Sequence, residues 1–269
     1  MLVAGVDIGS IATKAVVLRE REIVGRAVTP TGAAPGPASE AVLTAALHEA
    51  RVAREALQRV IATGYGRRVT PVADGTITEI TAAAKGAHLA LGDSVRTIVD
   101  LGGQDTKVIA LDQAGLVRTF AMNDKCAAGT GKFLEVMAHV LGVKLEDLAA
   151  LSLRAKTPAR LSATCTVFAE SEVISMIHRG LPPEEIAAAL HAAIGGRIAA
   201  MVEQVGQKEP IAFIGGGARN PAMRAALERA LGVSLRVPQH PQFTVATGAA
   251  LVARQACRGP QHGAENKSN

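Results

Sequence analysis

Apolar and β-branched residues form short runs in the first part of the chain, and the pattern occurs twice. Residues 2–8, 13–18 and 23–28 predict three strands, with a charged turn at residues 19–22. Residues 97–101, 106–111 and 116–121 predict three more. In each trio the first strand ends in an aspartate with glycine two positions on, Asp7-Ile8-Gly9 and Asp100-Leu101-Gly102. The repeat predicts two similar half-folds, each with a strand–Asp–Gly–strand unit.

The remaining segments are mostly helical in period. Helices are expected at residues 40–58, 79–91, 132–141, 145–153, 167–179, 183–205, 221–231 and 245–256. Short strands are expected at 59–63 and 211–214, each followed by a glycine-rich turn, and residues 29–39 are expected to form a loop. Strands mixed with helices indicate an α/β fold.

The repeat suggests a division of the chain into two half-domains. Residues 1–92 with 243–257 are expected to form the first, and residues 93–242 the second, which carries Cys126 and Cys165. Residues 258–269 are polar and are expected to form a flexible tail.

Composition excludes several classes of protein. The 269 residues are 48% hydrophobic and 20% charged, which is typical of a globular chain. Aromatic residues make up 2%, too few for stacking on single-stranded nucleic acid, and the net charge of +5 comes from scattered basic residues. No nucleic-acid partner is therefore expected. No leader pattern and no membrane span is evident, so a cytoplasmic location is expected.

The two Asp–Gly turns favour phosphate binding. Glycine lets backbone N–H groups approach a phosphate, and each aspartate is placed to hold hydrated Mg²⁺. Gln104 is suited to orienting a water molecule on the terminal phosphate. A third turn, residues 215–217, follows a strand and precedes a helix, which suits a nucleoside against bare backbone. Ordinary tight turns use the same residues and remain an alternative.

These turns supply the candidate site residues. The nucleotide-binding candidates are Asp7, Gly9, Ser10, Ala12, Thr13, Lys14, Asp100, Gly102, Gly103, Gln104, Gly129, Gly131, Gly215, Gly216, Gly217 and Asn220. The catalytic candidates are Asp7, Gln104 and Asp105. Two apparent motifs fail: residues 129–132 lack the first glycine and the Ser/Thr of a P-loop, and position 220 is Asn rather than the last Gly of a dinucleotide fingerprint.

The duplicated hairpins resemble those of the actin/hexokinase/Hsp70 superfamily of ATPases. The resemblance covers residues 2 to about 256. It implies two duplicated half-domains around a nucleotide cleft, with the two hairpin loops on the β- and γ-phosphates and the third glycine loop near adenosine.

The cysteines suggest a second kind of chemistry. Cys126 and Cys165 each shortly precede an expected helix, whose positive end stabilises a nearby anion. Two buried structural cysteines remain an alternative. Two thiolates fall short of the four that an iron–sulfur cube takes, but a twofold homodimer would supply four. No histidine lies within two residues of either cysteine, which weakens a zinc interpretation, and Cys257 adjoins the tail as a bystander.

The segments around these cysteines extend the resemblance to a family. Residues 6–10, 100–105, 123–131 and 164–173 are similar to those of activator ATPases of 2-hydroxyacyl-CoA dehydratases, in the BadF/BadG/BcrA/BcrD ATPase family, which includes benzoyl-CoA reductase ATPase subunits. The resemblance implies a homodimer that binds ATP or ADP with Mg²⁺ and bridges one [4Fe–4S] cluster through Cys126 and Cys165 of each subunit. It also implies a ferredoxin or flavodoxin as electron donor, and an iron–sulfur acyl-CoA dehydratase or reductase as acceptor.

Other functions on the same fold remain open. One is the ATPase subunit of a benzoyl-CoA reductase, which is the same chemistry with another acceptor. A sugar or acetate kinase would need a substrate-facing aspartate and no thiolates. An actin-like or chaperone-like ATP switch would have no redox role.

Overall fold

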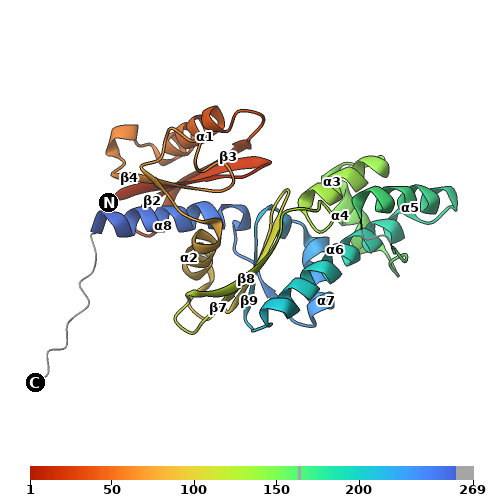
Figure 1. Ribbon diagram of the computed structural model, residues 1–269. Helices are drawn as coiled ribbons and strands as arrows, with labels where there is room; N and C mark the ends of the chain where they lie inside the picture. The colour runs from red at the N-terminus through yellow and green to blue at the C-terminus, as the bar shows by residue number, and fades with distance from the viewer. Residues whose placement is uncertain (163–164, 259–269) are drawn as a thin grey trace, which may run out of the picture. The chain divides into compact units, whose positions relative to one another are not determined.

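The computed structural model describes residues 1–162 and 165–258 (Figure 1). The chain folds into two units. Unit 1 comprises Met1–Gly86 and the C-terminal segment from Val245, and unit 2 comprises Ala87–Thr244. Each unit is built on one five-stranded mixed sheet.

Unit 1 has the strand order β3-β2-β1-β4-β5. The strands are β1 (Leu2–Ile8), β2 (Ala12–Arg19), β3 (Glu22–Pro30), β4 (Arg59–Thr63) and β5 (Gly75–Thr76). The helices are α1 (Pro35–Ala50), the short 3₁₀ helix η1 (Arg54–Ala56) and α8 (Thr244–Arg258), and α2 (Glu79–Leu91) carries the chain into unit 2.

Unit 2 has the strand order β10-β9-β6-β7-β8. The strands are β6 (Thr97–Leu101), β7 (Thr106–Leu111), β8 (Val117–Asn123), β9 (Ile211–Ile214) and β10 (Leu235–Arg236). The helices are α3 (Gly131–Val140), α4 (Leu145–Arg154), α5 (Thr166–His178), α6 (Pro183–Val205) and α7 (Pro221–Leu231), with 3₁₀ helices η2 (Gly216–Arg219) and η3 (Pro241–Phe243).

The two sheets repeat one arrangement. In unit 1, β1 pairs antiparallel with β2 and parallel with β4. In unit 2, β6 pairs antiparallel with β7 and parallel with β9. The duplication predicted from the hairpins is therefore confirmed, and it extends to the parallel strand and to the glycine turn that follows it, Gly64-Tyr65-Gly66 or Gly215-Gly216-Gly217.

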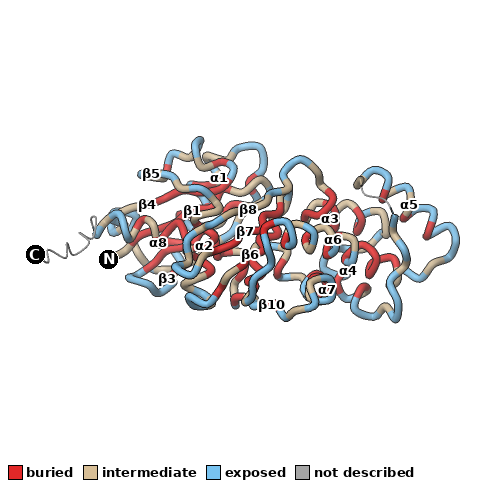
Figure 2. The backbone as a smooth tube through the Cα atoms, turned by 60° about the horizontal axis from the view of Figure 1, so that its bottom comes forward, coloured by how far each residue is buried: buried red, intermediate tan, exposed pale blue. Residues whose placement is uncertain are grey.

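Burial explains why the central strands are apolar throughout. Ala4, Val6 and Ile8 of β1 belong to the core that α1 covers, whereas Gly5 faces α8 so closely that a Cβ there would meet the backbone of Ala246. Strands buried on both faces read as continuous hydrophobic runs. Figure 2 shows the buried backbone concentrated along β1, β4 and β6.

Helix α6 is the central helix of the core of unit 2. It packs against α4, α7, β7 and β8, and Ile186, Ile194 and Ile198 are fully or almost fully buried in that core. Its length and apolar composition would also suit a membrane span, but 56% of its 18-residue apolar stretch is buried. Among the described residues it alone passes that test, and burial of this kind is what a core helix requires.

Most predicted elements agree with the structure to within two residues. The helix expected at residues 40–58 exists, but its bounds are wrong. Helix α1 begins at Pro35 inside the expected loop, because proline is well tolerated at the first helical position. It ends where Arg51 takes a left-handed conformation with φ of 54°. The two-residue strands β5 and β10 were not predicted. Arg258, expected to begin the tail, is the last residue of α8, and residues 259–269 of that tail lie outside the described part.

Two adjacent glycines of α6 provide a test of its packing. A Cβ at Gly195 would lie 3.1 Å from the carbonyl oxygen of Ala226 in α7, whereas a Cβ at Gly196 meets nothing within 4 Å. Gly196→Ala is expected to stabilise unit 2 by about 0.5–1 kcal/mol, because alanine is the better helix former. Gly195→Ala is expected to destabilise it by about 1 kcal/mol, because a backbone oxygen cannot move aside easily.

Urea unfolding of the two variants and the wild type measures this difference. Since the two positions share helix, residue type and substitution, propensity cancels in the comparison. Equal stabilisation by both substitutions would contradict the close α6–α7 contact.

Candidate functional site

The first hairpin loop is built around Asp7, which is 7% exposed at the end of β1. The antiparallel register places Asp7 opposite Lys14 of β2, and Lys14 Nζ lies 3.2 Å from Asp7 Oδ2. The loop closes with the Gly9 N–H donating to the Ala12 carbonyl at 3.2 Å. The structure therefore brings a buried carboxylate, an ammonium group and a glycine turn together in unit 1.

A buried pair of threonines fixes this loop from below. Thr31 Oγ1 donates to the Gly9 carbonyl at 2.7 Å, and Thr13 Oγ1 lies 2.8 Å from Thr31 Oγ1. A hydroxyl has one proton, so Thr13 is the donor in the bond between them. The Thr13 hydroxyl proton is therefore used in the bond to Thr31 that supports the loop. Sequence reasoning missed Thr31 because it lies in the expected loop at residues 29–39.

The second hairpin loop repeats this geometry in unit 2. Asp100 is 6% exposed and stands opposite Lys107 in the register. The Gly102 N–H donates to the Asp105 carbonyl at 2.9 Å, the counterpart of the bond in the first loop. Lys107 Nζ lies 2.7 Å from Asp105 Oδ2, and Lys107 is 3% exposed. Gln104 is exposed at the tip of the loop.

Lys107 was missed by sequence reasoning, although a signal for it exists. Lys14 follows Asp7 by the same number of positions as Lys107 follows Asp100. Aligning the two hairpins residue by residue would have found it. The buried ammonium group of Lys107 compensates the negative charge of Asp105 and holds one carboxylate oxygen in place.

Each strand-end aspartate is also packed against a glycine turn from the neighbouring parallel strand. Gly64 has φ of +92°, and a Cβ there would lie 2.7 Å from Asp7 Oδ1. Gly215 has φ of +86°, and a Cβ there would meet Asp100 Oδ1 and the Leu101 carbonyl. Glycine is required at both positions for the same two reasons, the left-handed backbone and the lack of space. Gly216, between Gly215 and Gly217, is the exposed backbone of the third glycine loop.

The loop that carries Cys126 is attached to the second hairpin loop. The Gly131 and Lys132 N–H groups donate to the carbonyls of Gly102 and Gly103 at 3.0 and 2.8 Å. Thr106 Oγ1 donates to the Gly129 carbonyl at 2.7 Å. Residues 126–131 therefore share backbone contacts with the predicted phosphate loop of unit 2.

Asn123 shapes the same loop from the other side. Its Nδ2 donates to the carbonyls of Cys126 and Ala128, each at 3.0 Å. Cys126 is half-buried against the core of unit 2 and is separated from α3 by a turn, so Thr130 rather than Cys126 is the N-cap of that helix. Asn123 begins the family-like segment 123–131, but sequence reasoning did not predict its supporting role.

Cys165 is the N-cap residue of α5. Its carbonyl accepts from the Ala169 N–H at 2.8 Å, and its thiol makes no capping bond. The Glu172 carboxylate accepts from the N–H of Ser162, three residues before Cys165, at 2.9 Å. Helices α3 and α5, which follow the Cys126 loop and Cys165, pack against each other. Ala163 and Thr164, part of the motif, lie outside the described residues.

The donor set fits a shared iron–sulfur cluster by its chemistry. Cys126 and Cys165 are free thiols, and thiolates are the usual ligands of such clusters. Within the described ranges no group of three or more His, Cys, Asp or Glu residues could hold a metal ion. One chain supplies two thiols, so a four-ligand cluster at these residues would need a second copy.

Asn220 lies at the end of the third glycine loop, but its side chain is engaged within unit 2. Its Oδ1 accepts from the Met223 N–H at 3.0 Å and caps α7. Its Nδ2 lies 3.1 Å from Nε2 of His191, a residue of α6 with no exposed surface. His191 Nδ1 lies 2.8 Å from the Ala187 carbonyl. Burial lowers the pKa of His191 below its usual 6.5, and the charge of Arg229 acts in the same direction.

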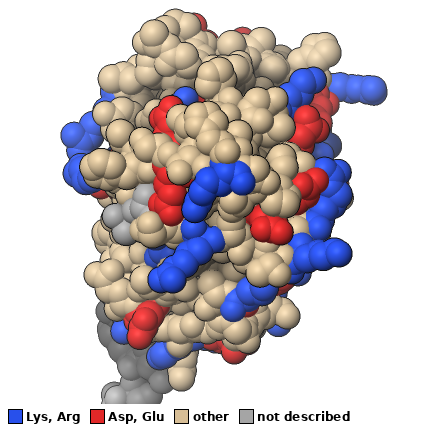
Figure 3. Space-filling view, turned by 90° about the vertical axis from the view of Figure 1, so that its right-hand side faces the viewer, with Lys and Arg blue, Asp and Glu red and all other residues tan. Residues whose placement is uncertain are grey.

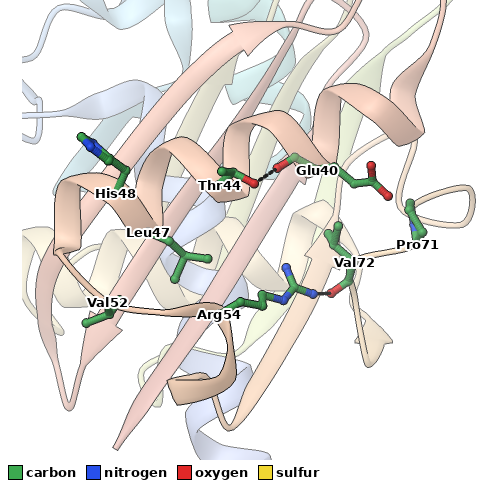
Figure 4. Close-up of a pocket in the computed structure, with 8 residues that line it drawn as sticks. All are labelled: Glu40, Thr44, Leu47, His48, Val52, Arg54, Pro71 and Val72. Carbon is green, nitrogen blue, oxygen red and sulfur yellow. Dashed lines mark hydrogen bonds between the residues drawn. The ribbon is translucent and has the colours of Figure 1, made fainter.

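A surface hollow in unit 1 contains none of the candidate residues. It has a volume of about 580 Å³ and lies beside α1, with Leu47 and Val72 on its floor and Glu40 at one end (Figure 4). Arg54 Nη2 is turned away to the Val72 carbonyl at 2.9 Å. The predicted chemistry lies at other residues.

The face over the α5 end of unit 2 is mixed in charge. Figure 3 shows Lys and Arg side chains interspersed with Asp and Glu among uncharged residues. Helix α5 adds exposed apolar side chains, Val167 at 67%, Phe168 at 70% and Ile174 at 41%. This end of unit 2 therefore carries apolar surface next to Cys165.

Two sheets of identical order, each with an Asp–Gly hairpin, define a nucleotide-binding fold of the actin and hexokinase type. Solved structures of that type are similar to the chain. A ROK family glucokinase from Streptomyces griseus matches with a TM-score of 0.58 at 16% identity, over 95% of this chain and 100% of the glucokinase. At that identity the likeness shows the fold alone.

A model of the BadF/BadG/BcrA/BcrD ATPase family matches residues 4–253, and the chain belongs to this family. The 2-hydroxyisocaproyl-CoA dehydratase activator of Clostridioides difficile is 38% identical over 99% of this chain and 100% of that protein. The (R)-2-hydroxyglutaryl-CoA dehydratase activating ATPase of Acidaminococcus fermentans is 40% identical over 93% and 95%. The structure of the Clostridium difficile activator with bound ADPNP matches with a TM-score of 0.92 over 100% of both chains, at 38% identity.

The buried His191 predicts a pH dependence of stability. Its folded pKa lies below the unfolded value of 6.5, so the unfolded chain binds a proton that the folded chain does not. The wild type should therefore lose stability as the pH falls below about 6.5, by up to about 1.4 kcal/mol per pH unit, until the folded pKa is reached.

His191→Gln lacks this titration, because glutamine stays neutral. The difference in unfolding free energy between wild type and variant should shift against the wild type between pH 7.5 and 5.5, as measured by urea titrations at each pH. A difference that stays constant over that range would show that His191 titrates alike in both states.

Proposed function

We propose that this protein is an ATP-hydrolysing activator that delivers low-potential electrons to an acyl-CoA dehydratase or a related reductase. Three observations support the proposal: membership of the ATPase family, relatives named as dehydratase activators over nearly the whole chain, and two free cysteines in the unit that carries two of the glycine loops. The observation that carries it is the set of backbone bonds between the Cys126 loop and the second hairpin loop.

The hairpin loops are proposed to bind the phosphates of ATP. Ser10 and Gly103 would offer backbone N–H groups, and Lys14 would offer positive charge. Gly9 and Gly102 would shape the two turns, because their N–H groups bond across the loops to the Ala12 and Asp105 carbonyls. Asp7 and Asp100 are carboxylates at strand ends and would hold Mg²⁺ through its water molecules. Asp105, held by Lys107, and the exposed Gln104 would orient the attacking water.

The third glycine loop is proposed to meet the nucleoside. Gly216 presents exposed backbone there, and Gly215 and Gly217 fix the loop against Asp100 and Leu101. The candidate Asn220 supports this loop through its side chain, which caps α7 and contacts His191. Gly129 and Gly131 would act indirectly, through their bonds to the second hairpin.

Cys126 and Cys165 are proposed to hold one [4Fe–4S] cluster together with the same residues of a second copy. Such a cluster, when bound, supplies a one-electron redox centre. The chain's own contribution is the backbone around the thiols. Asn123, at the end of β8, holds the Cys126 loop, and Glu172 of α5 bonds Ser162, three residues before Cys165.

The state of the nucleotide would reach Cys126 along bonded backbone. A shift of Gly102 and Gly103 when the terminal phosphate leaves would pull on Gly131 and Lys132, which donate to their carbonyls. Thr106 ties Gly129 to the same hairpin. Hydrolysis of ATP can therefore be coupled to the surroundings of a thiol without a separate moving domain.

The electron acceptor would be an iron–sulfur enzyme acting on an acyl-CoA. The exposed apolar residues of α5 next to Cys165 offer surface for a second copy and for such an acceptor. A benzoyl-CoA reductase subunit of Thauera aromatica is 30% identical over 80% of this chain, so a reductase is the second candidate acceptor. A ferredoxin or flavodoxin is proposed as the donor, in an anaerobic cytoplasm.

Gln104 provides a test of the hydrolytic role. Gln104→Ala should lower kcat for ATP hydrolysis about 100-fold, because the attacking water loses its positioning group. The affinity for ADP should change less than twofold, since the loop backbone is retained. Steady-state phosphate release and ADP titration measure the two quantities.

Ile11 is the matched control, because it holds the position in the first hairpin that Gln104 holds in the second. Ile11 is 40% exposed, and Ile11→Ala should leave kcat within about threefold. An equal loss of kcat in both variants would show that loop conformation, rather than the amide of Gln104, accounts for the effect.

Cys126 provides a test of the redox role. Anaerobically purified wild type should contain about four iron and four sulfide per two chains. Cys126→Ser should lose at least nine-tenths of both and lose its dimeric state, while still binding ADP.

Cys257→Ser is the matched control and should keep the iron, because Cys257 belongs to α8 of unit 1, whereas both proposed ligands belong to unit 2. Wild-type protein that remains colourless and monomeric after anaerobic reconstitution would overturn the redox role. An ATPase without such a role would then remain.

A further inference from the structure

His191 is buried, titratable and unused by the functions described above. It has no exposed surface and lies in the first half of α6, among apolar residues. Histidine in such a position needs partners for both ring nitrogens, because an unbonded buried polar group is costly. Both partners are present, Ala187 on its own helix and Asn220 at the start of α7.

The hydrogen bonds leave one arrangement of protons. Asn220 Oδ1 must accept from the Met223 N–H, so Nδ2 is the group that faces His191. Since Nδ2 donates, His191 Nε2 carries no proton and accepts. Nδ1 therefore carries the proton and donates to the Ala187 carbonyl. The result is a continuous chain of bonds from the backbone of α6 to the N-cap of α7.

The contact lies where the third glycine loop ends. Residues 215–217 lead through η2 into Asn220, and the Asn220 N–H itself donates to the Gly217 carbonyl at 3.1 Å. His191 and Gly195 are one turn apart on α6 and both face α7, where Gly195 allows the close approach to Ala226. The same two helices bury the apolar residues Ile198, Met223 and Leu227.

An apolar residue at position 191 would avoid burying an imidazole, but it would leave the Asn220 amide without its acceptor. A bonded histidine instead restricts the amide of Asn220 to one orientation and fixes the end of the glycine loop relative to α6. Resting on the proposed function, in which this loop meets the nucleoside, we propose that His191 is a positioning residue of the nucleotide site. It acts on nucleotide affinity through Asn220 and touches no reacting atom.

Two variants break the same bond from opposite sides. His191→Leu removes the acceptor. Asn220→Ser removes the donor but keeps a residue type that caps helices well, so α7 retains its N-cap. His191→Gln keeps an acceptor oxygen and is the conservative variant. All are made in the full chain and purified without oxygen, so that any cluster is retained.

We expect His191→Leu and Asn220→Ser each to raise the Kd for ADP and the KM for ATP at least threefold, with kcat within twofold. His191→Gln should restore both constants to within twofold of wild type. The double variant should be no weaker than the weaker single variant, because one bond is removed in each case. If His191→Leu fails to fold, the Kd for ADP and the KM for ATP of Asn220→Ser, compared with those of wild type and His191→Gln, test the same bond.

Unchanged Kd and KM in folded Asn220→Ser, with only a lower unfolding temperature, would overturn the inference and leave His191 a packing residue. Losses that multiply in the double variant would overturn it as well. Failure of the wild type to bind ADP is a different result, visible before any variant is compared, and would overturn the proposed function together with this inference.

Discussion

The structure depends on a buried carboxylate at the end of the central strand of each sheet. Burying an aspartate is unfavourable unless charge and hydrogen bonds compensate it. Asp7 has Lys14 across the hairpin, and Asp100 stands opposite Lys107 in the same register. The antiparallel register of each hairpin places a lysine opposite each aspartate, and a glycine turn from the parallel neighbour leaves room for the carboxylate oxygens. In each unit the hairpin loop and the glycine turn meet around this aspartate.

The two units use this arrangement differently. In unit 1 the loop is closed from below by buried threonines, Thr13 and Thr31, and its cation pairs with the strand-end Asp7. In unit 2 the equivalent Thr106 reaches the Cys126 loop, and Lys107 pairs with Asp105, which has alanine as its counterpart in unit 1. One half of the duplication therefore bonds its loop within its own hairpin segment, whereas the other connects its loop to the segment that carries Cys126.

Local patterns predicted most of this fold. The strand runs, the duplication, the strand at residues 211–214 and the helices at residues 79–91, 183–205 and 221–231 followed from period and turn residues, because these segments are apolar and bounded by Gly or Pro. Helix α1 was misplaced because a Pro-rich start looks like a loop. Thr31, Lys107 and His191 were missed because their importance comes from contacts across the sheet or between helices, and one sequence does not show such pairings. Asn220 was predicted to bind nucleotide, which stays a prediction, and sequence reasoning did not show that its side chain caps α7 and meets His191.

The two sheets share one strand order, but the connection between their third and fourth strands along the chain differs greatly in length. In unit 1 the connection from β3 to β4 holds α1 and one short turn of helix, whereas in unit 2 the connection from β8 to β9 holds α3, α4, α5 and α6. Both cysteines stand in that longer connection. The same sheet arrangement therefore forms with a short or a long connection between those two strands. Exchange of this one insert would give the same nucleotide-driven frame another output, which makes it the natural place to graft a new function.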